Sequence, residues 1–143
     1  MQINTITMLV AETVLNKTFK QVVPGITIVQ ENVKGTPPSP DQTSEYIAFT
    51  VNYGTSLKYA HDPQNRSNIY QRPGIATAQI FTPLGVGTGR AVEIADLIIS
   101  GLQDVEFADR CLTISSVTAT KIGPSGSFYQ MNVDLAFQYF EQN

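Results

Sequence analysis

The 143-residue sequence has no tryptophan, one cysteine and one histidine, and only 15% of its residues are charged. The lone Cys111 cannot form a disulfide within the chain, and the lone His61 leaves no His or Cys cluster of the kind that binds zinc. We therefore expect no metal or cofactor, and we expect Cys111 to be a small buried hydrophobic residue rather than a nucleophile. These shortages argue against an enzyme.

Positive charge is also scarce, with 9 Lys and Arg residues against 12 Asp and Glu residues. They form no basic stripe of the kind that holds nucleic acid. No apolar run approaches the ~20 residues of a membrane-spanning helix, and the first residues lack the basic and apolar regions of a secretory signal. We expect a protein that is assembled in the cytoplasm, does not enter a membrane, and self-associates because it carries few charges.

The strongest pattern in the chain is a strand, a glycine-rich turn and a helix. Ile75–Thr82 is predicted to be the strand and Arg90–Gln103 the helix, with Thr88 as its cap. The apolar helix residues fill one arc and the polar ones lie opposite. The apolar set is Ala91, Val92, Ile94, Ala95, Ile98, Ile99 and Leu102, and the polar set is Glu93, Asp96, Ser100 and Gln103. This pattern predicts a helix packed on a sheet.

A glycine-rich turn before a helix can also bind phosphate. The Gly85-x-Gly87-x-Gly89 spacing matches neither the dinucleotide fingerprint nor a Walker loop, and Arg90 is the one cation beside it. We favour a structural turn with positive φ at its glycines, and keep a small-ligand enzyme using Gly85–Gly89 as the minor alternative. Two carboxylate pairs, Asp41 with Glu45 and Glu106 with Asp109, are expected to be solvated charges.

The remaining patterns complete an α+β single domain over residues 1–143. They predict a helix at Thr7–Val22 and strands at Ile26–Gln30, Tyr46–Val51, Leu112–Ile122 and Phe128–Phe140, with a surface loop at Gly35–Asp41. We expect a mixed or mostly antiparallel sheet of about five strands, two helices packed on one face, and a long hairpin arm. In the last strand, Tyr129 to Tyr139 alternate towards the core, and Gln130, Asn132, Asp134 and Gln138 face the other way.

The predicted arm spans Asn52–Gly74, a polar segment dotted with aromatic and basic residues, with its tip near His61-Asp62-Pro63. Connections this long inside a compact domain are usually functional or disordered. Tyrosine and arginine are favoured at protein interfaces, so one interpretation is an arm that contacts another subunit; the other is a hairpin that packs on its own domain. The candidate interface residues are Tyr53, Tyr59, His61, Arg66, Tyr70 and Arg72.

Several of these segments resemble one known family. They are Gln71–Pro83, Gly85–Gly89, Ala95–Ile98 and, upstream, Glu31–Val33. Together they are similar to the small tail-completion, or tail-terminator, proteins of tailed bacteriophages. The likeness covers the layout of roughly residues 5–139, but only Arg72–Leu102 is motif-like, and the Pro37–Pro40 loop has no counterpart that we can match.

The resemblance implies a structural virion protein of the neck and tail. It implies a ring, usually a hexamer, that caps the head-proximal end of the tail tube, stops its growth and offers a surface to the head connector. Because the chain is acidic, we expect the polar set Gln130, Asn132, Asp134 and Gln138 to suit a lumen through which genomic DNA passes without specific binding. The alternatives are a head-completion adaptor or stopper and a tail-tube protein of the same region.

Overall fold

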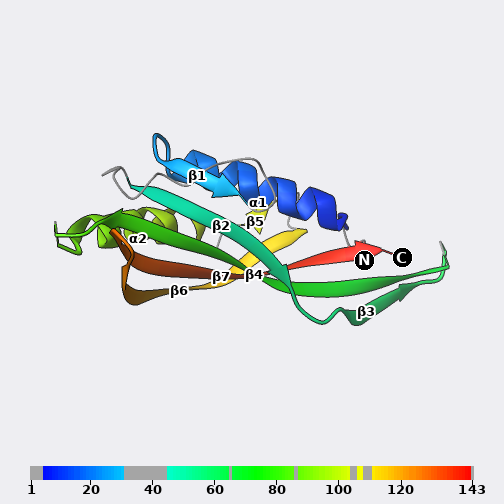
Figure 1. Ribbon diagram of the computed structural model, residues 1–143. Coiled ribbons are helices and arrows are strands. Elements are labelled where there is room, and N and C mark those ends of the chain that lie inside the picture. The colour runs from blue at the N-terminus through cyan, green and yellow to red at the C-terminus, as the bar shows by residue number, and fades with distance from the viewer. Residues whose placement is uncertain are drawn as a thin grey trace.

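The computed structural model describes residues 5–30, 45–64, 66–85, 87–103, 106–107 and 111–142. The predicted Pro37–Pro40 loop lies outside them. Two helices and seven strands follow one another along the chain (Figure 1). Their bounds are α1 Met8–Val22, β1 Thr27–Gln30, β2 Tyr46–Tyr53, β3 Leu57–Asp62, β4 Ser67–Pro83, α2 Gly89–Leu102, β5 Glu106–Phe107, β6 Leu112–Ser125 and β7 Phe128–Gln142.

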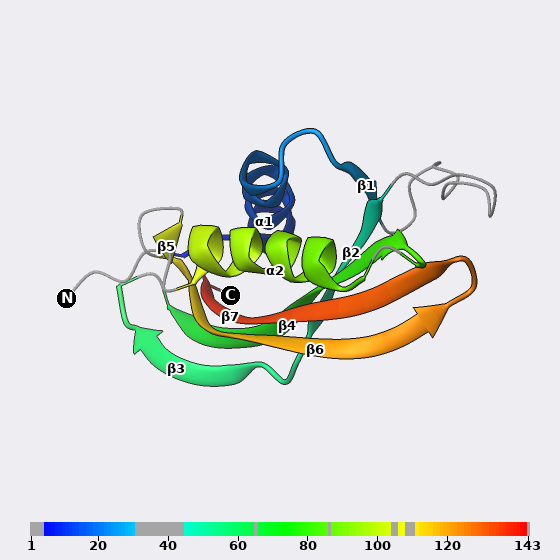
Figure 2. The same cartoon turned by 90° about the vertical axis from the view of Figure 1, so that its left-hand side faces the viewer.

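The strands form one mixed sheet in the order β1-β2-β4-β7-β6-β5, with β3 paired to β4. Only β1 and β2 run parallel; the other pairs are antiparallel. The predicted α+β class, single sheet and two-helix cover are confirmed, and both helices lie on one side of the sheet (Figure 2). The strand count exceeds the expected five because β3, which has no buried alternation, and the two-residue β5 are also strands.

Strand β4 is the centre of the sheet. One of its edges pairs with β7 over most of its length, from Ile69 opposite Gln142 to Pro83 opposite Phe128. Its other edge pairs with β3 near its start and with β2 farther on. The strand predicted at Ile75–Thr82 is therefore only the half of β4 that the helices cover.

Helix α1 begins where the Thr7 side chain accepts a hydrogen bond from the Val10 amide, at 3.3 Å. Its buried stripe, Ala11, Leu15 and Phe19, lies on the sheet, where Phe19 stacks on Phe49 with ring centroids 4.2 Å apart. Apolar spacing thus decides which side of α1 is buried.

No helix among the described residues is long and apolar enough to cross a membrane.

Helix α2 buries the arc that its sequence predicts, namely Ala91, Ile94, Ala95, Ile98 and Leu102, while Glu93 and Asp96 are exposed. The prediction for Thr88 is wrong: it sits at the cap position, but its side chain makes no cap hydrogen bond. Its own backbone is helical, with φ −94° and ψ −5°, so the residue lacks the extended geometry of a capping side chain.

The core lies between the helices and one face of β2, β4, β6 and β7. In β7 the predicted alternation is confirmed at Met131, Val133, Leu135, Phe137 and Tyr139, which are all buried. Tyr129, at the start of the pattern, is only half-buried. Each fully buried large apolar side chain stabilises the fold by roughly 1.5–3 kcal/mol. This burial fixes the register of the last strand, because a slip by one residue would turn the whole apolar set to solvent.

The arm consists of β3, the Ser67–Pro73 part of β4 and the Phe140–Gln142 end of β7. It projects beyond the helix-covered body (Figure 1). The expected hairpin is formed by β3 and β4, and β7, which continues alongside β4 to Gln142, adds a third strand to it. Its turn follows Asp62 and ends at Arg66, slightly beyond the predicted tip.

Candidate functional site

The face of the sheet that the helices leave open is the first candidate surface. Residues opposite one another across neighbouring strands share a face, so the register places Gln130, Asn132, Asp134 and Gln138 of β7 beside the odd-numbered residues of β4. All four are half-buried and lie opposite the core residues of the same strand. Their predicted orientation, away from the core, is therefore correct.

Hydrogen bonds join these polar side chains to one another and to β4. The Thr77 hydroxyl donates to Asp134 Oδ1 at 2.8 Å, and the Gln71 amide donates to Gln138 Oε1 at 2.6 Å. Gln130 donates to Asn132 Oδ1 at 2.9 Å. Because each side chain is held by a neighbour, the face presents a fixed pattern of amides and hydroxyls instead of freely turning groups.

Charge is nearly absent from this surface. Among the described residues that β2, β4 and β7 turn to it between Tyr46 and Gln138, Asp134 is the one charged side chain. Near one end of the face Tyr46 stacks on Phe81, at 4.6 Å, and meets the edge of Phe128, at 5.2 Å. Burial raises the pKa of the Tyr46 hydroxyl, which therefore stays neutral. The surface can accept water and neutral polar partners, but offers no cation to a phosphate.

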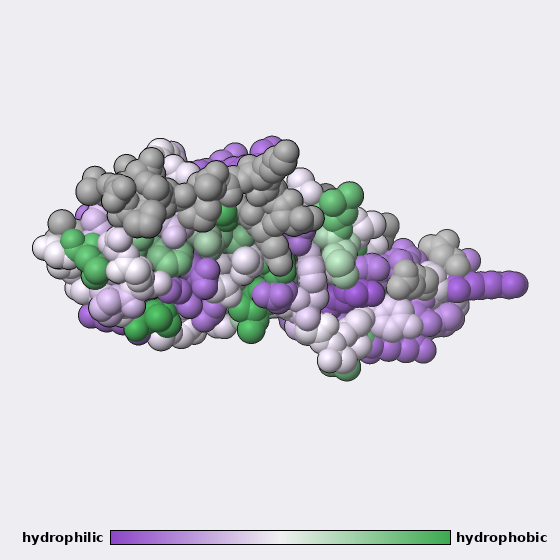
Figure 3. All heavy atoms as spheres, in the orientation of Figure 1, coloured by the Kyte–Doolittle hydropathy of each residue, from purple (hydrophilic) through white to green (hydrophobic). Residues whose placement is uncertain are grey.

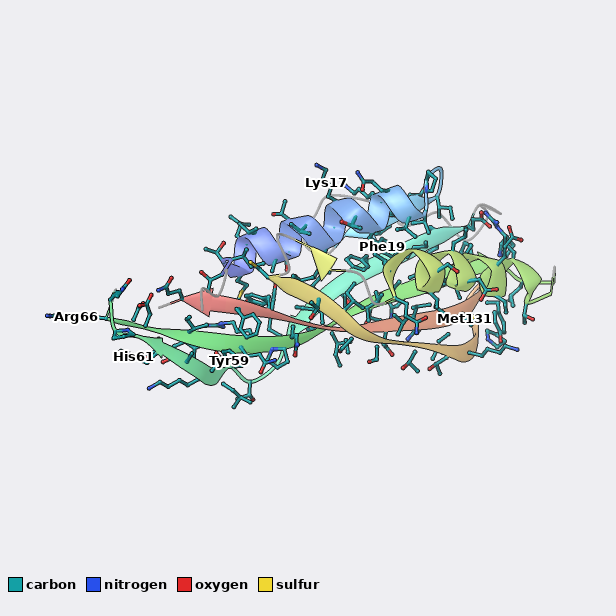
Figure 4. The ribbon with its side chains drawn as sticks, turned by 180° about the vertical axis from the view of Figure 1, so that it is seen from behind. Lys17, Phe19, Tyr59, His61, Arg66 and Met131 are labelled. Atoms are coloured by element: carbon teal, nitrogen blue, oxygen red, sulfur yellow. The ribbon has the colours of Figure 1, made fainter. Side chains whose placement is uncertain are left out.

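The arm is the second candidate surface, and three of the six predicted interface residues lie on its outer part (Figure 4). The Tyr59 side chain is 52% exposed, with its ring 4.9 Å from that of Phe140. His61 is exposed, with Nδ1 2.9 Å from Asn68 Oδ1. Arg66 ends the turn with a positive φ of 50°, a strained conformation for a residue that has a side chain. Hydrophilic residues gather at this end of the molecule (Figure 3).

The other predicted interface residues lie nearer the body. The Tyr53 hydroxyl donates to Glu12 of α1 at 3.0 Å, and Arg72 Nε lies 3.2 Å from Glu141 Oε2. Burial, and then the charge of Glu141, raise the pKa of the adjacent Tyr139. Tyr70 is half-buried on the same strand as Arg72. The structure thus places five of the six residues along the arm and Tyr53 at the end of β2, and does not gather them into one patch; their role at a subunit contact stays a prediction.

An ion pair that the sequence patterns missed joins the start of β2 to the first turn of α2. Arg90 Nε donates to both Glu45 oxygens, at 2.8 and 3.0 Å, and Arg90 Nη1 also reaches Glu93 at 2.8 Å. The hydrogen bonds from Arg90 lower the pKa of the Glu45 carboxyl, outweighing the opposite effect of burial. The expectation that Glu45 is simply solvated is wrong. The side chains of Asp41, Glu106 and Asp109 lie outside the described residues.

The glycine-rich turn has the predicted positive φ at Gly85 and Gly87, of 87° and 82°, but not at Gly89, which is the first residue of α2. Arg90, the cation beside it, is already engaged by two carboxylates. In the part of the chain that the structure describes, no group of three His, Cys, Asp or Glu residues could hold a metal ion, and Cys111 is buried as predicted. The turn therefore offers backbone amides without a spare charge.

Comparison with known proteins shows the fold alone. No family model and no curated protein sequence matches this chain. Among solved structures, 23 chains match it. One of them superposes with a TM-score of 0.68 over 94% of this chain and 96% of that chain, at 14% sequence identity. The two proteins share an architecture over nearly their whole length, and an identity this low carries no function from one to the other.

Proposed function

We propose that this chain is a structural subunit of a tailed-phage virion, which closes into a ring at the head-proximal end of the tail tube. There it stops the tube from growing and presents a docking surface to the head connector. The resemblance of Arg72–Leu102 to tail-terminator proteins motivates the proposal. The stretch forms most of β4 and all of α2, which pack together in the centre of the domain.

The observation that carries the proposal is the open face of the sheet. A channel for DNA needs a hydrated wall that does not hold phosphates, because a basic wall would bind the duplex and slow its passage. The open face supplies amides and hydroxyls that are bonded to one another, with Asp134 as its charged group. We assign this face to the lumen and the helix-covered side to the outside of the ring.

The shape of the subunit supports a ring. The arm and α2 lie at opposite ends of an elongated chain (Figure 1), so a contact between one copy's arm and the next copy's body joins unlike surfaces. A repeated contact of this kind closes when its rotation divides the circle, and otherwise gives an open filament. Closure is what makes a cap. A hexamer would match the ring that the resemblance implies.

Three measurements test the proposal. The purified protein should form a ring, or a monomer in equilibrium with a ring, when its mass is measured in solution, and it should cap isolated tail tubes. Loss of its gene should give abnormally long tails. Tails of normal length with defective capsid filling would indicate a head-completion protein instead, and assembly of the purified chain into long tubes would indicate a tube protein.

A further inference from the structure

Strand β6 leaves a long edge without a partner. It pairs with β7 along its length, but with β5 only at Leu112 and Thr113. The register with β7 shifts at Ser115 and again at Ile122. Between these two bulges Ser116–Lys121 forms an uninterrupted ladder, and all its residues except the half-buried Val117 are exposed. The outer backbone groups of this segment face no other described strand.

The composition of this edge invites pairing. Natural edge strands are usually protected by prolines, charged side chains or bulges, since free N–H and C=O groups attract another strand. Here Pro124 and the two bulges lie outside Ser116–Lys121, and Lys121 is its only charged residue. Valine and threonine, which favour strands, occupy three of its central positions. The segment is a regular template that is open along its whole length.

A second open edge lies in the arm. Strand β3, six residues long, pairs only with β4 among the described strands. Its side chains are poorly covered, with Leu57 61% and Tyr59 52% exposed. A small sheet needs a buried hydrophobic face for stability, and the arm largely lacks one, so a further strand on the β3 edge would add backbone hydrogen bonds where little apolar surface is buried.

We propose that β3 of one copy pairs with the Ser116–Lys121 edge of β6 in a second copy. The sheets of neighbouring subunits would then continue into each other around the ring. The inference rests on the proposed ring and adds the contact that closes it. Because the two edges differ and lie on opposite sides of the sheet, the contact is head-to-tail, as ring closure requires.

Charge favours the same pairing. Strand β3 carries the exposed Lys58 near its start and Asp62 at its end, and the exposed Arg66 follows at the tip. With the paired Arg72 and Glu141 left out, two cations against one carboxylate give this part of the arm a net charge of +1. Helix α2, which contacts β6, exposes Asp96 and also Glu93, which is paired with Arg90. Figure 2 shows α2 and β6 on one side of the molecule, with the arm receding behind them. A weakly cationic arm would thus approach the β6 edge beside a weakly acidic helix.

Cysteine cross-linking tests the contact directly. Ala60→Cys in β3 should form a disulfide with one of Thr118→Cys, Ala119→Cys or Thr120→Cys in β6 when the two variants are mixed and oxidised, since paired residues across a ladder lie within disulfide range. The linked species should form only between copies and only with one or two of the three partners. Ala60→Cys alone, with the buried Cys111 retained, is the control. Cross-linking of all three to similar extents would indicate random collision and overturn the contact.

Neighbouring prolines provide an independent test. Along β6, successive N–H groups point alternately towards β7 and outwards, so of Thr118→Pro and Ala119→Pro one removes a bond within the sheet and the other removes an outward donor. The proline that removes the outward-pointing N–H keeps the bonds to β7, so that variant should melt closer to the wild type. It should nevertheless assemble at least tenfold less tightly than the wild type. If that variant forms rings like the wild type, the contact lies elsewhere, with the outer edge of β1 as the next candidate. A wild-type chain that never forms a ring would contradict the proposed function itself.

Charge reversal tests the expected attraction between the arm and the acidic residues of α2. Arg66→Glu should weaken assembly by roughly two- to fivefold, the range expected for exposed ion pairs, and Asp96→Lys in the partner copy should restore part of the loss. Lys17→Glu, on the outward side of α1, makes the same charge change and should have little effect (Figure 4). Equal losses from Arg66→Glu and Lys17→Glu would mean that only net charge matters.

Discussion

Strand β4 runs through the body and the arm, and its two halves are stabilised in different ways. Under the helices its alternate residues Ala76, Ala78, Ile80 and Thr82 are 0% exposed. In the arm, from Ser67 to Pro73, only Ile69 is buried. The same strand keeps the same partner, β7, in both halves. Pairing alone therefore does not distinguish them; apolar burial does.

The comparison shows where stability and function divide in this chain. A hydrogen bond makes a net contribution of about 0.5–1.5 kcal/mol to the unfolding free energy, whereas each large apolar side chain on the buried face adds roughly 1.5–3 kcal/mol. Regions with little burial open first, and moving or assembling elements are drawn from them. We infer that the body sets the unfolding free energy and that the arm, with its exposed Tyr59, His61 and Arg66, is kept for contacts with other copies.

The largest expected effect comes from a charge placed in the body. Ile98→Asp puts an unpaired carboxylate at a position that is 0% exposed, which should cost several kcal/mol and prevent folding. Asp96→Ala, on the exposed side of the same helix, should melt close to the wild type. Circular dichroism during thermal unfolding measures both. A soluble Ile98→Asp protein that melts cooperatively would show that α2 does not pack as described.

A smaller loss is expected at the junction between body and arm. At Gly74 an added Cβ would overlap the Phe137 ring and lie 2.6 Å from the Asn52 carbonyl oxygen, so Gly74→Ala should destabilise the protein by about 1–3 kcal/mol. Gly54→Ala is the matched control, since its Cβ would meet only the flexible Pro73 ring, at 3.2 Å. Urea unfolding compares the two. Equal unfolding midpoints for the two variants would mean that β2 and β7 shift enough to accommodate a Cβ at residue 74.

The body could be predicted from the sequence because its signals are local and periodic. The arc of α2 and the alternation of β7 each repeat the burial that the structure shows at Ile94, Ile98, Val133 and Leu135. Because successive side chains of a strand point to opposite faces, the alternation in β7 predicts which of its residues face the core and which face the open side. The orientation of Asp134 on the candidate lumen surface was therefore predictable, although its hydrogen bond to Thr77 was not.

The arm and the ion pair were harder to predict, because their determinants are distant in sequence. The strand β3 lacks an apolar alternation, since neither of its faces is buried, and it forms because β4 beside it is held by β7. Glu45 and Arg90 lie 45 positions apart, and no local pattern links them. The cap at Thr88 failed for a different reason: its residue type fits, but its backbone is already helical.

The Glu45–Arg90 pair should make body stability weakly dependent on pH. Because folding lowers the pKa of Glu45, the pair stabilises the protein above the unfolded-state pKa, and this contribution is lost as the pH falls through the lower folded-state pKa. Both groups are partly exposed, so we expect only about 0.5–1 kcal/mol, less in high salt. Comparing the unfolding of wild type and Glu45→Gln at pH 7 and pH 3 isolates it. A constant difference across that range would contradict the assignment.

The smallest effect on stability, and the one that separates the two regions most sharply, is expected in the arm. Tyr59→Ala and Arg66→Gly alter side chains that are largely exposed, and glycine also relieves the positive φ of residue 66, so each should change the unfolding free energy by less than about 1 kcal/mol. Amide exchange across β3 should be fast in the free chain and slow after assembly, and both variants should weaken assembly while leaving exchange in β7 beneath α2 unchanged. If β3 exchanges as slowly before assembly as after it, the arm is held by its own chain, and the contrast between body and arm loses its functional meaning.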